Sequence, residues 1–169
     1  MGQAPSLRRP LTPLSSIDRM RQVHCSFYLR RGIAYVPTVA KTQAGYWLGI
    51  EPVDVERVSD AEALKAVLLR AISRGNPIVP TPSREHFPRD VMRRYCGMRS
   101  FSAFERTTQL WSISQHGDEY VICPWRRSER YRGAWEEDDE RRATIPAGMS
   151  LQEVVGKAAE LAFLSRDGR

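Results

Sequence analysis

The sequence has no long apolar run. Its longest stretches, such as residues 67–69 and 161–164, are far shorter than the roughly 20 residues that a helix needs to span a bilayer, so we expect no transmembrane helix. Near the N-terminus, Pro10 and Pro13 interrupt the segment that follows two arginines, and this interruption prevents the apolar core of a secretory signal. A classical export signal is therefore not expected.

Cysteine and histidine are also scarce, with three residues of each. Cys25, Cys96 and Cys123 are odd in number and far apart, which does not make a disulfide framework and is typical of a reducing compartment. A zinc site needs about four Cys or His ligands, usually in paired short spacings, and the sequence contains no such pairs. We expect a cytoplasmic protein that has no metal ion or other cofactor.

Neither of the two common glycine-rich nucleotide-binding motifs occurs in the sequence. A cysteine nucleophile needs a base and positively charged neighbours, and Cys96 beside Arg93, Arg94 and Arg99 is the candidate. The favoured interpretation of Cys96 is a small buried residue that ends a helix. The sequence therefore predicts a protein that is not an enzyme.

The residues that are present suit one folded domain. Of the 169 residues, 41% are hydrophobic and 27% are charged, which is enough apolar side chain for a core and an ordinary charged surface. Residues 1–19 combine three prolines with almost no apolar periodicity, so we expect a disordered tail before a single domain at residues 20–169. The ordered pattern begins at Met20, and both an over-long reading frame and a functional arm remain open explanations of the tail.

The first half of the domain predicts three strands and a helix. Residues 23–29 and 33–39 are rich in β-branched and aromatic side chains and flank a predicted turn, and residues 46–55 form a third extended stretch. The turn is Arg30-Arg31-Gly32, and Pro52 should place an edge or a bend in the third strand.

A capping box at Ser59 and Glu62 predicts the start of the helix, and residues 75–77, which read Gly-Asn-Pro, predict its end. Its apolar stripe consists of Leu64, Val67, Leu68, Ala71 and Ile72.

The proline-rich residues 77–88 should form an extended connector between two halves of the chain. Short helices are predicted at about residues 89–95, closed by Gly97, and at residues 100–106. A second hairpin should pair residues 110–114 with residues 119–125.

A second capping box, at Ser150 and Glu153, predicts the last helix. Its apolar stripe consists of Leu151, Val154, Val155, Ala158, Ala159, Ala162 and Phe163. Aligned by their capping boxes, the two helices place Val155 on Leu64 and Ala159 on Leu68, so the halves form a pseudo-repeat or resemble one another by coincidence. Both helices need a sheet face to cover, and the prediction is an α+β fold with a mostly antiparallel sheet.

Residues 125–132 interleave arginines with Trp125 and Tyr131, a pattern that suits nucleic acid, and 23 of the 26 basic residues are arginine. An acidic block follows directly and disfavours phosphate contacts. The same region suits a protein interface better, because aromatic anchors beside blocks of opposite charge are typical of specific binding surfaces. The candidate binding residues are Trp125, Tyr131, Trp135, Glu136, Glu137, Asp138, Asp139 and Glu140. The alternative is a solvated hairpin loop whose aromatic side chains pack into the core.

Several ordered motifs resemble a family of small bacterial immunity proteins from contact-dependent growth inhibition systems. They are residues 33–42 (IAYVPTVAKT), 45–47 (GYW), the helix capped at Ser59, residues 75–80 (GNPIVP) and residues 102–106 (SAFER), within a similarity that covers residues 21–163. The resemblance implies a cytoplasmic, non-enzymatic protein that binds the C-terminal toxin domain of a large secreted effector. Such a protein would block the active site or the substrate surface of the toxin.

The net charge of +6 contrasts with the acidic character that is frequent among immunity proteins against nuclease toxins. Binding depends on charge within a Debye length of about 8 to 10 Å rather than on the total charge. The acidic block at residues 136–140 supplies such a local patch against a nuclease. If the toxin is not a nuclease, the basic face is the expected interface, and a nucleic-acid-associated regulator is the alternative function.

Overall fold

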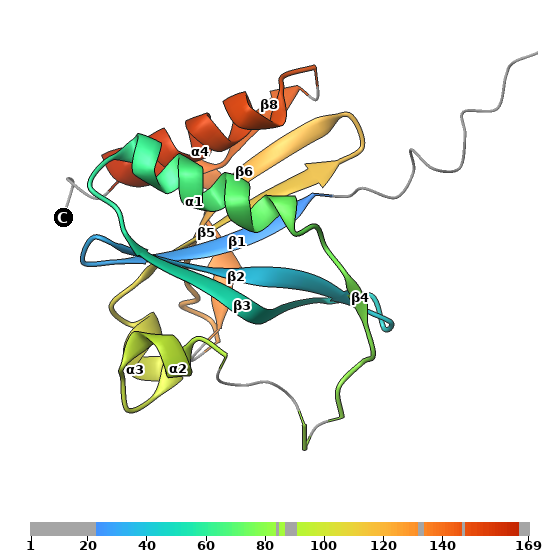
Figure 1. Cartoon of the computed structure of the whole chain (residues 1–169), viewed down its shortest axis with the longest axis vertical. Coiled ribbons are helices and arrows are strands. Elements are labelled where there is room, and N and C mark those ends of the chain that lie inside the picture. The colour runs from blue at the N-terminus through green and yellow to red at the C-terminus, as the bar shows by residue number, and fades with distance from the viewer. Residues whose placement is uncertain (1–22, 84, 87–90, 132–133, 147, 166–169) are drawn as a thin grey trace, which may run out of the picture.

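A computed structural model of the chain describes residues 23–83, 85–86, 91–131, 134–146 and 148–165. Within these residues, one sheet has the strand order β3-β2-β1-β5-β6-β7, with β4 paired to β2 and β8 paired to β6. The two long helices, α1 and α4, cover one face of the sheet, and the short helices α2 and α3 lie on the other face (Figure 1). The predicted α+β fold is confirmed, whereas the predicted tail at residues 1–19 lies outside the described residues.

The first predicted hairpin consists of β1 (His24–Arg30) and β2 (Ile33–Thr42). Arg31 and Gly32 connect them with φ angles of 50° and 76°, the left-handed pair that a two-residue hairpin turn requires. At the outer edge, β3 (Trp47–Arg57) pairs antiparallel with β2. The register of this pair shifts between Pro37 and Thr38, and the Glu51–Pro52 peptide bond is cis, so Pro52 lies at an irregular place in an edge strand as predicted.

The helix α1 (Ala61–Ser73) begins one residue later than the capping box predicts. The N-cap is Asp60, whose carboxylate accepts the N–H of Ala63 at 2.8 Å, and the Ser59 hydroxyl donates to that carboxylate. These hydrogen bonds hold the pKa of Asp60 below its usual value. The predicted Ser59 capping box is therefore wrong, because the extended backbone of Asp60 (φ −149°, ψ 177°) makes Asp60 the N-cap and places its carboxylate against the free N–H groups of the first turn.

The connector after α1 contains the short strand β4 (Ile78–Val79), which runs parallel to β2. Beyond it lie α2 (Arg93–Cys96), which ends at the left-handed Gly97, and α3 (Phe101–Glu105), whose N-cap is Ser100. These helices shield a small apolar cluster on their face of the sheet, whose buried members are Tyr35, Val53, Met92, Cys96 and Phe104. The predicted start of α2 at residue 89 lies outside the described residues.

The second predicted hairpin is also present, as β5 (Gln109–His116) and β6 (Glu119–Arg127). Two short strands then share β6 as their partner: β7 (Trp135–Glu137) pairs with its C-terminal end and β8 (Ala143–Pro146) with its N-terminal end. The predicted capping box of Ser150 and Glu153 is confirmed at the start of α4 (Leu151–Leu164).

The two halves of the chain occupy corresponding places in the sheet. β1 and β5 pair at the centre, β2 and β6 flank them, and α1 packs beside α4. The main core fills the space between the helices and the sheet. Its helical members are Leu64, Val67, Leu68, Ala71, Val154, Val155, Ala158, Ala159 and Ala162. The predicted match of Leu64 with Val155 and of Leu68 with Ala159 thus joins buried positions, although the caps differ by one residue.

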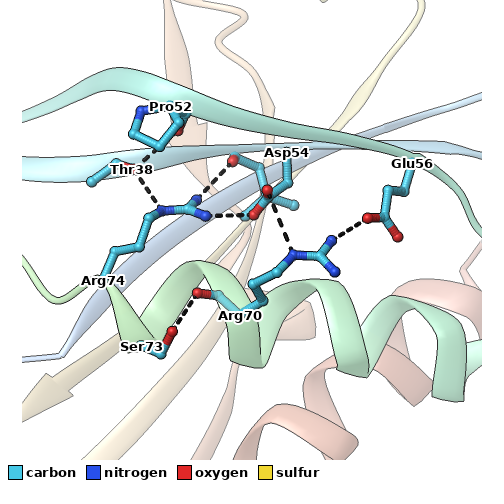
Figure 2. A network of polar contacts seen from close by, with 8 residues as sticks. Thr38, Pro52, Asp54, Glu56, Arg70, Ser73 and Arg74 are labelled. Atoms are coloured by element: carbon cyan, nitrogen blue, oxygen red, sulfur yellow. Dashed lines mark hydrogen bonds and ion pairs between the residues drawn. The ribbon is translucent and has the colours of Figure 1, made fainter.

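Four polar side chains fasten α1 to the edge strand β3 (Figure 2). Arg74 donates to Asp54 at 2.6 Å and to the hydroxyl of Thr38 at 2.8 Å. Arg70 forms ion pairs with Asp54 and Glu56 one turn earlier on the helix. The carboxylates alternate along the strand and the arginines are four residues apart on the helix, so both sets face one another. This network positions α1 on the sheet and is a structural feature.

Candidate partner-binding surface

The eight predicted binding residues lie together along one edge of the sheet. Trp125 lies opposite Glu137 in the β6–β7 register, and Trp135 lies opposite Arg127. Tyr131 belongs to the loop between these strands and is 59% exposed. The remaining acidic residues continue from β7 into a single 3-10 turn, η2 (Asp139–Arg141), that leads to β8. Strand pairing therefore brings residues 125–131 and 134–140 together at one edge of the sheet.

The buried carboxylate of Glu105 organises this surface from below. Glu105, at the end of α3, accepts the indole N–H of Trp135 at 2.7 Å on one oxygen and a guanidinium N–H of Arg127 at 3.2 Å on the other. The Arg127 guanidinium also lies 4.4 Å from the centre of the Trp135 ring, a cation–π contact. Glu105 is only 9% exposed, so these partners balance a charge that burial alone would penalise.

The Glu105 network extends to a tyrosine in the second apolar cluster. Burial and, to a smaller extent, the nearby Glu105 carboxylate raise the pKa of Tyr28 to about 12, while Arg127 opposes this rise. Tyr28 thus stays a neutral phenol. It packs against Phe104, with 5.5 Å between the two ring centres. The inner side of the surface is accordingly in contact with the second apolar cluster.

The acidic block is largely paired with arginines of the same edge. Arg126 donates to Glu136 at 3.0 Å across the β6–β7 pair, and Arg141 donates to the buried Asp138 at 2.7 Å. Arg142 lies 3.7 Å from Glu137 and 3.6 Å from Asp139. The sequence predicts a continuous acidic patch, whereas in the structure four of its five carboxylates form ion pairs with three arginines.

The three aromatic residues differ in their exposure. Trp125 is half-buried and donates its indole N–H to the hydroxyl of Ser112 at 2.9 Å. Trp135 is also half-buried, over Arg127, while Tyr131 projects with the Arg130 guanidinium 5.3 Å from its ring centre. The described arginines of the run at residues 125–132 are thus engaged within the protein, which leaves this run less suited to nucleic acid than its sequence indicates.

Cys96, the alternative candidate for a nucleophile, lies in buried, apolar surroundings. Cys96 is 8% exposed at the C-terminal end of α2, in the second apolar cluster. Burial raises the pKa of the Cys25 thiol to about 12. Among the described residues, no three His, Cys, Asp or Glu side chains are grouped so as to hold a metal ion. No helix in the described part of the chain is long and apolar enough to cross a membrane.

Two hollows were not foreseen from the sequence. The larger, a groove of about 1040 Å³, runs between the end of α1, β4 and the β2–β3 turn, and Trp47 lies in its wall. There Trp47 stacks on His24 with ring centres 4.6 Å apart, and burial, followed by the charge of His116, lowers the pKa of His24 to about 4. The smaller hollow, of about 210 Å³, lies between the β1–β2 turn and the loop after α3.

Comparison with known proteins rests on structure alone, because no protein-family model and no curated protein matches this sequence. A Neisseria meningitidis protein of unknown function, NMB0488, has a similar fold, with a TM-score of 0.61 and 18% sequence identity over 86% of this chain and 94% of that chain. A chain of the CdiA-CT/CdiI toxin and immunity complex from Yersinia pseudotuberculosis is also similar, with a TM-score of 0.56 and 15% identity. The similarity covers 87% of this chain and 98% of that chain.

Proposed function

We propose that this chain is a cytoplasmic immunity protein that binds and neutralises a cognate toxin domain of a contact-dependent growth inhibition system. The observation that carries the proposal is the fold shared with a chain of the CdiA-CT/CdiI toxin and immunity complex, across 98% of that chain. The motifs at residues 33–42, 75–80 and 102–106 independently resemble immunity proteins of such systems. In this function the protein is not an enzyme, and it acts by covering the active site or the substrate surface of the toxin.

The sheet edge at residues 125–140 is the surface that we assign to the toxin. It combines a rigid base, in which Glu105 holds Trp135 and Arg127, with an exposed Tyr131 and side chains such as Asp139 that are 78% exposed. Rigid aromatic side chains lose little conformational entropy when a partner covers them.

The ion pairs of this edge do not prevent it from attracting a basic partner. Exposed pairs contribute about 0 to 1 kcal/mol each, so an incoming cation can replace an arginine at small cost. Residues 125–142 contain six acidic side chains and six arginines, so this segment is neutral overall, although the whole chain carries +6. The five consecutive acidic residues at 136–140 form the acidic end of this edge, and this end favours a basic surface of the toxin.

The test is co-purification of this chain with the product of the adjacent gene, followed by a toxicity assay of that product with and without this chain. We expect a stable complex and rescue of growth. A toxin domain from an unrelated growth inhibition system serves as the control and should be neither bound nor neutralised. If the adjacent gene encodes a toxin whose toxicity persists in the presence of excess folded protein, the proposal is refuted.

A further inference from the structure

The smaller hollow has an unusual concentration of arginine. Arg30, Arg31 and Arg106 line it together with Gly32 and two threonines, Thr107 and Thr108. The three arginines come from the two sides of the cavity, since Arg30 ends β1, Arg31 begins the β1–β2 turn and Arg106 follows α3. A cavity of about 210 Å³ between these segments is the size of a small polar ligand rather than of a protein segment.

A fourth arginine lies beside this cavity. The strand register places Arg30 opposite Ile33 and Ile33 opposite Arg57, so Arg30 and Arg57 lie two strands apart, at about 10 Å between backbones. Alternation along β3 turns Asp54 and Glu56 toward α1, and Arg57 therefore faces the opposite side, with α3. Arg57 is exposed there and adds its charge to the same face.

These arginines differ in one respect from seven other arginines in the described part of the chain. Arg70, Arg74, Arg94, Arg126, Arg127, Arg141 and Arg142 each form an ion pair with a carboxylate. Among the described residues, Arg30, Arg31, Arg57 and Arg106 form none. The nearest carboxylates in sequence, Glu56 and Glu105, are committed to Arg70 and to Arg127.

Arg30 is held in a position that leaves its binding atoms free. Its Nε donates to the Thr107 hydroxyl at 2.8 Å, and that hydroxyl in turn donates to the carbonyl of Phe104 at 3.0 Å. The two terminal nitrogens of Arg30 have no partner among the described residues. Their N–H groups can therefore donate two parallel hydrogen bonds to the oxygens of one oxyanion.

We propose that the cavity between the β1–β2 turn and the α3–β5 loop is a binding site for a phosphoryl group, with Arg30, Arg31 and Arg106 as ligands and Arg57 as a flanking charge. Charge balance favours a phosphoryl group over a carboxylate as the ligand. A carboxylate supplies one negative charge, whereas a phosphate monoester carries about −1.5 to −2 at neutral pH. Three guanidinium groups around one small cavity match the higher charge. Free phosphate and the terminal phosphate of a nucleotide or RNA share this chemistry.

The test is calorimetric titration of the full chain with inorganic phosphate, at an ionic strength kept constant with sodium chloride. We expect one binding site per chain, and Arg106→Gln should weaken the affinity by about tenfold or more because it removes a charged hydrogen-bond donor. Arg30→Gln should have a similar effect, and thermal unfolding of both variants establishes that they fold. Arg94→Gln is the matched control. Arg94 lies on α2, is 74% exposed and forms an ion pair with Glu51 of β3.

Three further ligands, a nucleoside 5′-monophosphate, its nucleoside and an RNA without a terminal phosphate, separate the sources of the phosphoryl group. A nucleoside 5′-monophosphate that binds more tightly than phosphate, while its nucleoside does not bind, would assign the site to a nucleotide or an RNA terminus. Equal affinities for the monophosphate and for phosphate would assign it to free phosphate. An RNA without a terminal phosphate that binds when phosphate does not would overturn the proposal in favour of a general polyanion surface.

Phosphate that does not bind at all, or that binds equally weakly to Arg94→Gln and Arg106→Gln, would also overturn it. These titrations contain no toxin, so their outcome is independent of the proposed immunity function.

Discussion

The sheet edge at β7 and the turn between β1 and β2 both present arginine on the α3 side of the sheet, in opposite surroundings. At β7, Arg127 shares a buried carboxylate with Trp135, and its neighbours in the acidic block are paired as well. At the turn, Arg30 and Arg106 line a cavity that contains no described carboxylate. The difference teaches that the number of arginines in a segment says little about what it can bind. What the segment can bind depends on which of its arginines are already neutralised by carboxylates of the same protein.

The core beneath both regions sets the scale for all other effects. Leu68 of α1 is fully buried in the main core, so Leu68→Ala should lower the free energy of unfolding by about 2 to 5 kcal/mol through loss of burial and formation of a cavity. Ala159→Asp on the facing helix should also destabilise strongly, because it buries a charge. The measurement is urea unfolding, with Leu164→Ala as the control because Leu164 is 73% exposed. Near-normal stability of either core variant would contradict the packing of α1 against α4.

Removal of the shared carboxylate tests the paired region most directly. Glu105→Ala should cost about 2 to 3 kcal/mol of folding free energy, since it leaves the Arg127 guanidinium and the Trp135 indole N–H without their acceptor. Arg106→Gln, one residue further on, should change the folding free energy by less than about 0.5 kcal/mol because Arg106 is exposed and has no described carboxylate partner. Equal destabilisation of the two variants would remove the contrast between the regions.

Trp135 tests whether the paired region binds the partner. Trp135→Ala should weaken toxin binding by about 2 kcal/mol or more, chiefly through faster dissociation, if the ring is an anchor that the toxin covers. Trp135→Phe retains a ring and loses only the indole N–H that Glu105 accepts, so it should retain most of the affinity. Surface plasmon resonance against the candidate toxin domain provides both rates. An unchanged dissociation rate for a folded Trp135→Ala would exclude this anchor.

Charge reversal is the mildest perturbation of the same edge. Replacing Glu136, Glu137 and Asp139 by lysine should leave the fold intact and slow association by about threefold to tenfold at low salt, because charges at the rim steer the encounter. The effect should shrink as the ionic strength rises and the Debye length falls below about 10 Å. A matched control reverses Glu62 and Glu160 on α1 and α4, which are 81% and 60% exposed on the opposite face. Association rates that match the wild type would redirect attention to the exposed arginines of other faces, among them Arg94 and Arg99.

Periodicity and turn signals predict most of the fold from the sequence. The capped amphipathic helices, both hairpins and the antiparallel sheet follow from patterns within about a dozen residues, where local preferences and burial agree. The start of α1 differs because Ser59 and Asp60 both suit an N-cap, and only the backbone geometry selects the aspartate. Strand order, and hence the meeting of Arg30 with Arg106, depends on contacts between residues that are far apart in the sequence.

The sequence predicts which residues make up the candidate surface, but it does not predict which of their charges form ion pairs. Residues 125–140 lie close together in sequence, so a hairpin brings them together in any case. The buried acceptor of Trp135, Glu105, comes from a helix thirty positions away, and nothing in its neighbourhood marks it as buried. The arginines at the β1–β2 turn were visible as a turn motif, yet the lack of carboxylates around them appears only in three dimensions.

Asn76, which the sequence marks only as part of a helix stop, has a second consequence. The β1–β2 register that pairs Tyr28 with Tyr35 would place His24 opposite Val39. There the Asn76 amide lies between the strands instead, accepting from the His24 N–H at 2.9 Å and donating to the carbonyls of His24 and Val39 at 2.7 Å each. One side chain thus acts as a spacer that keeps two strands splayed at this end of the sheet. Because Asn76 follows the last residue of α1 by only three positions, the same hydrogen bonds also fix where the end of α1 lies relative to β1 and β2.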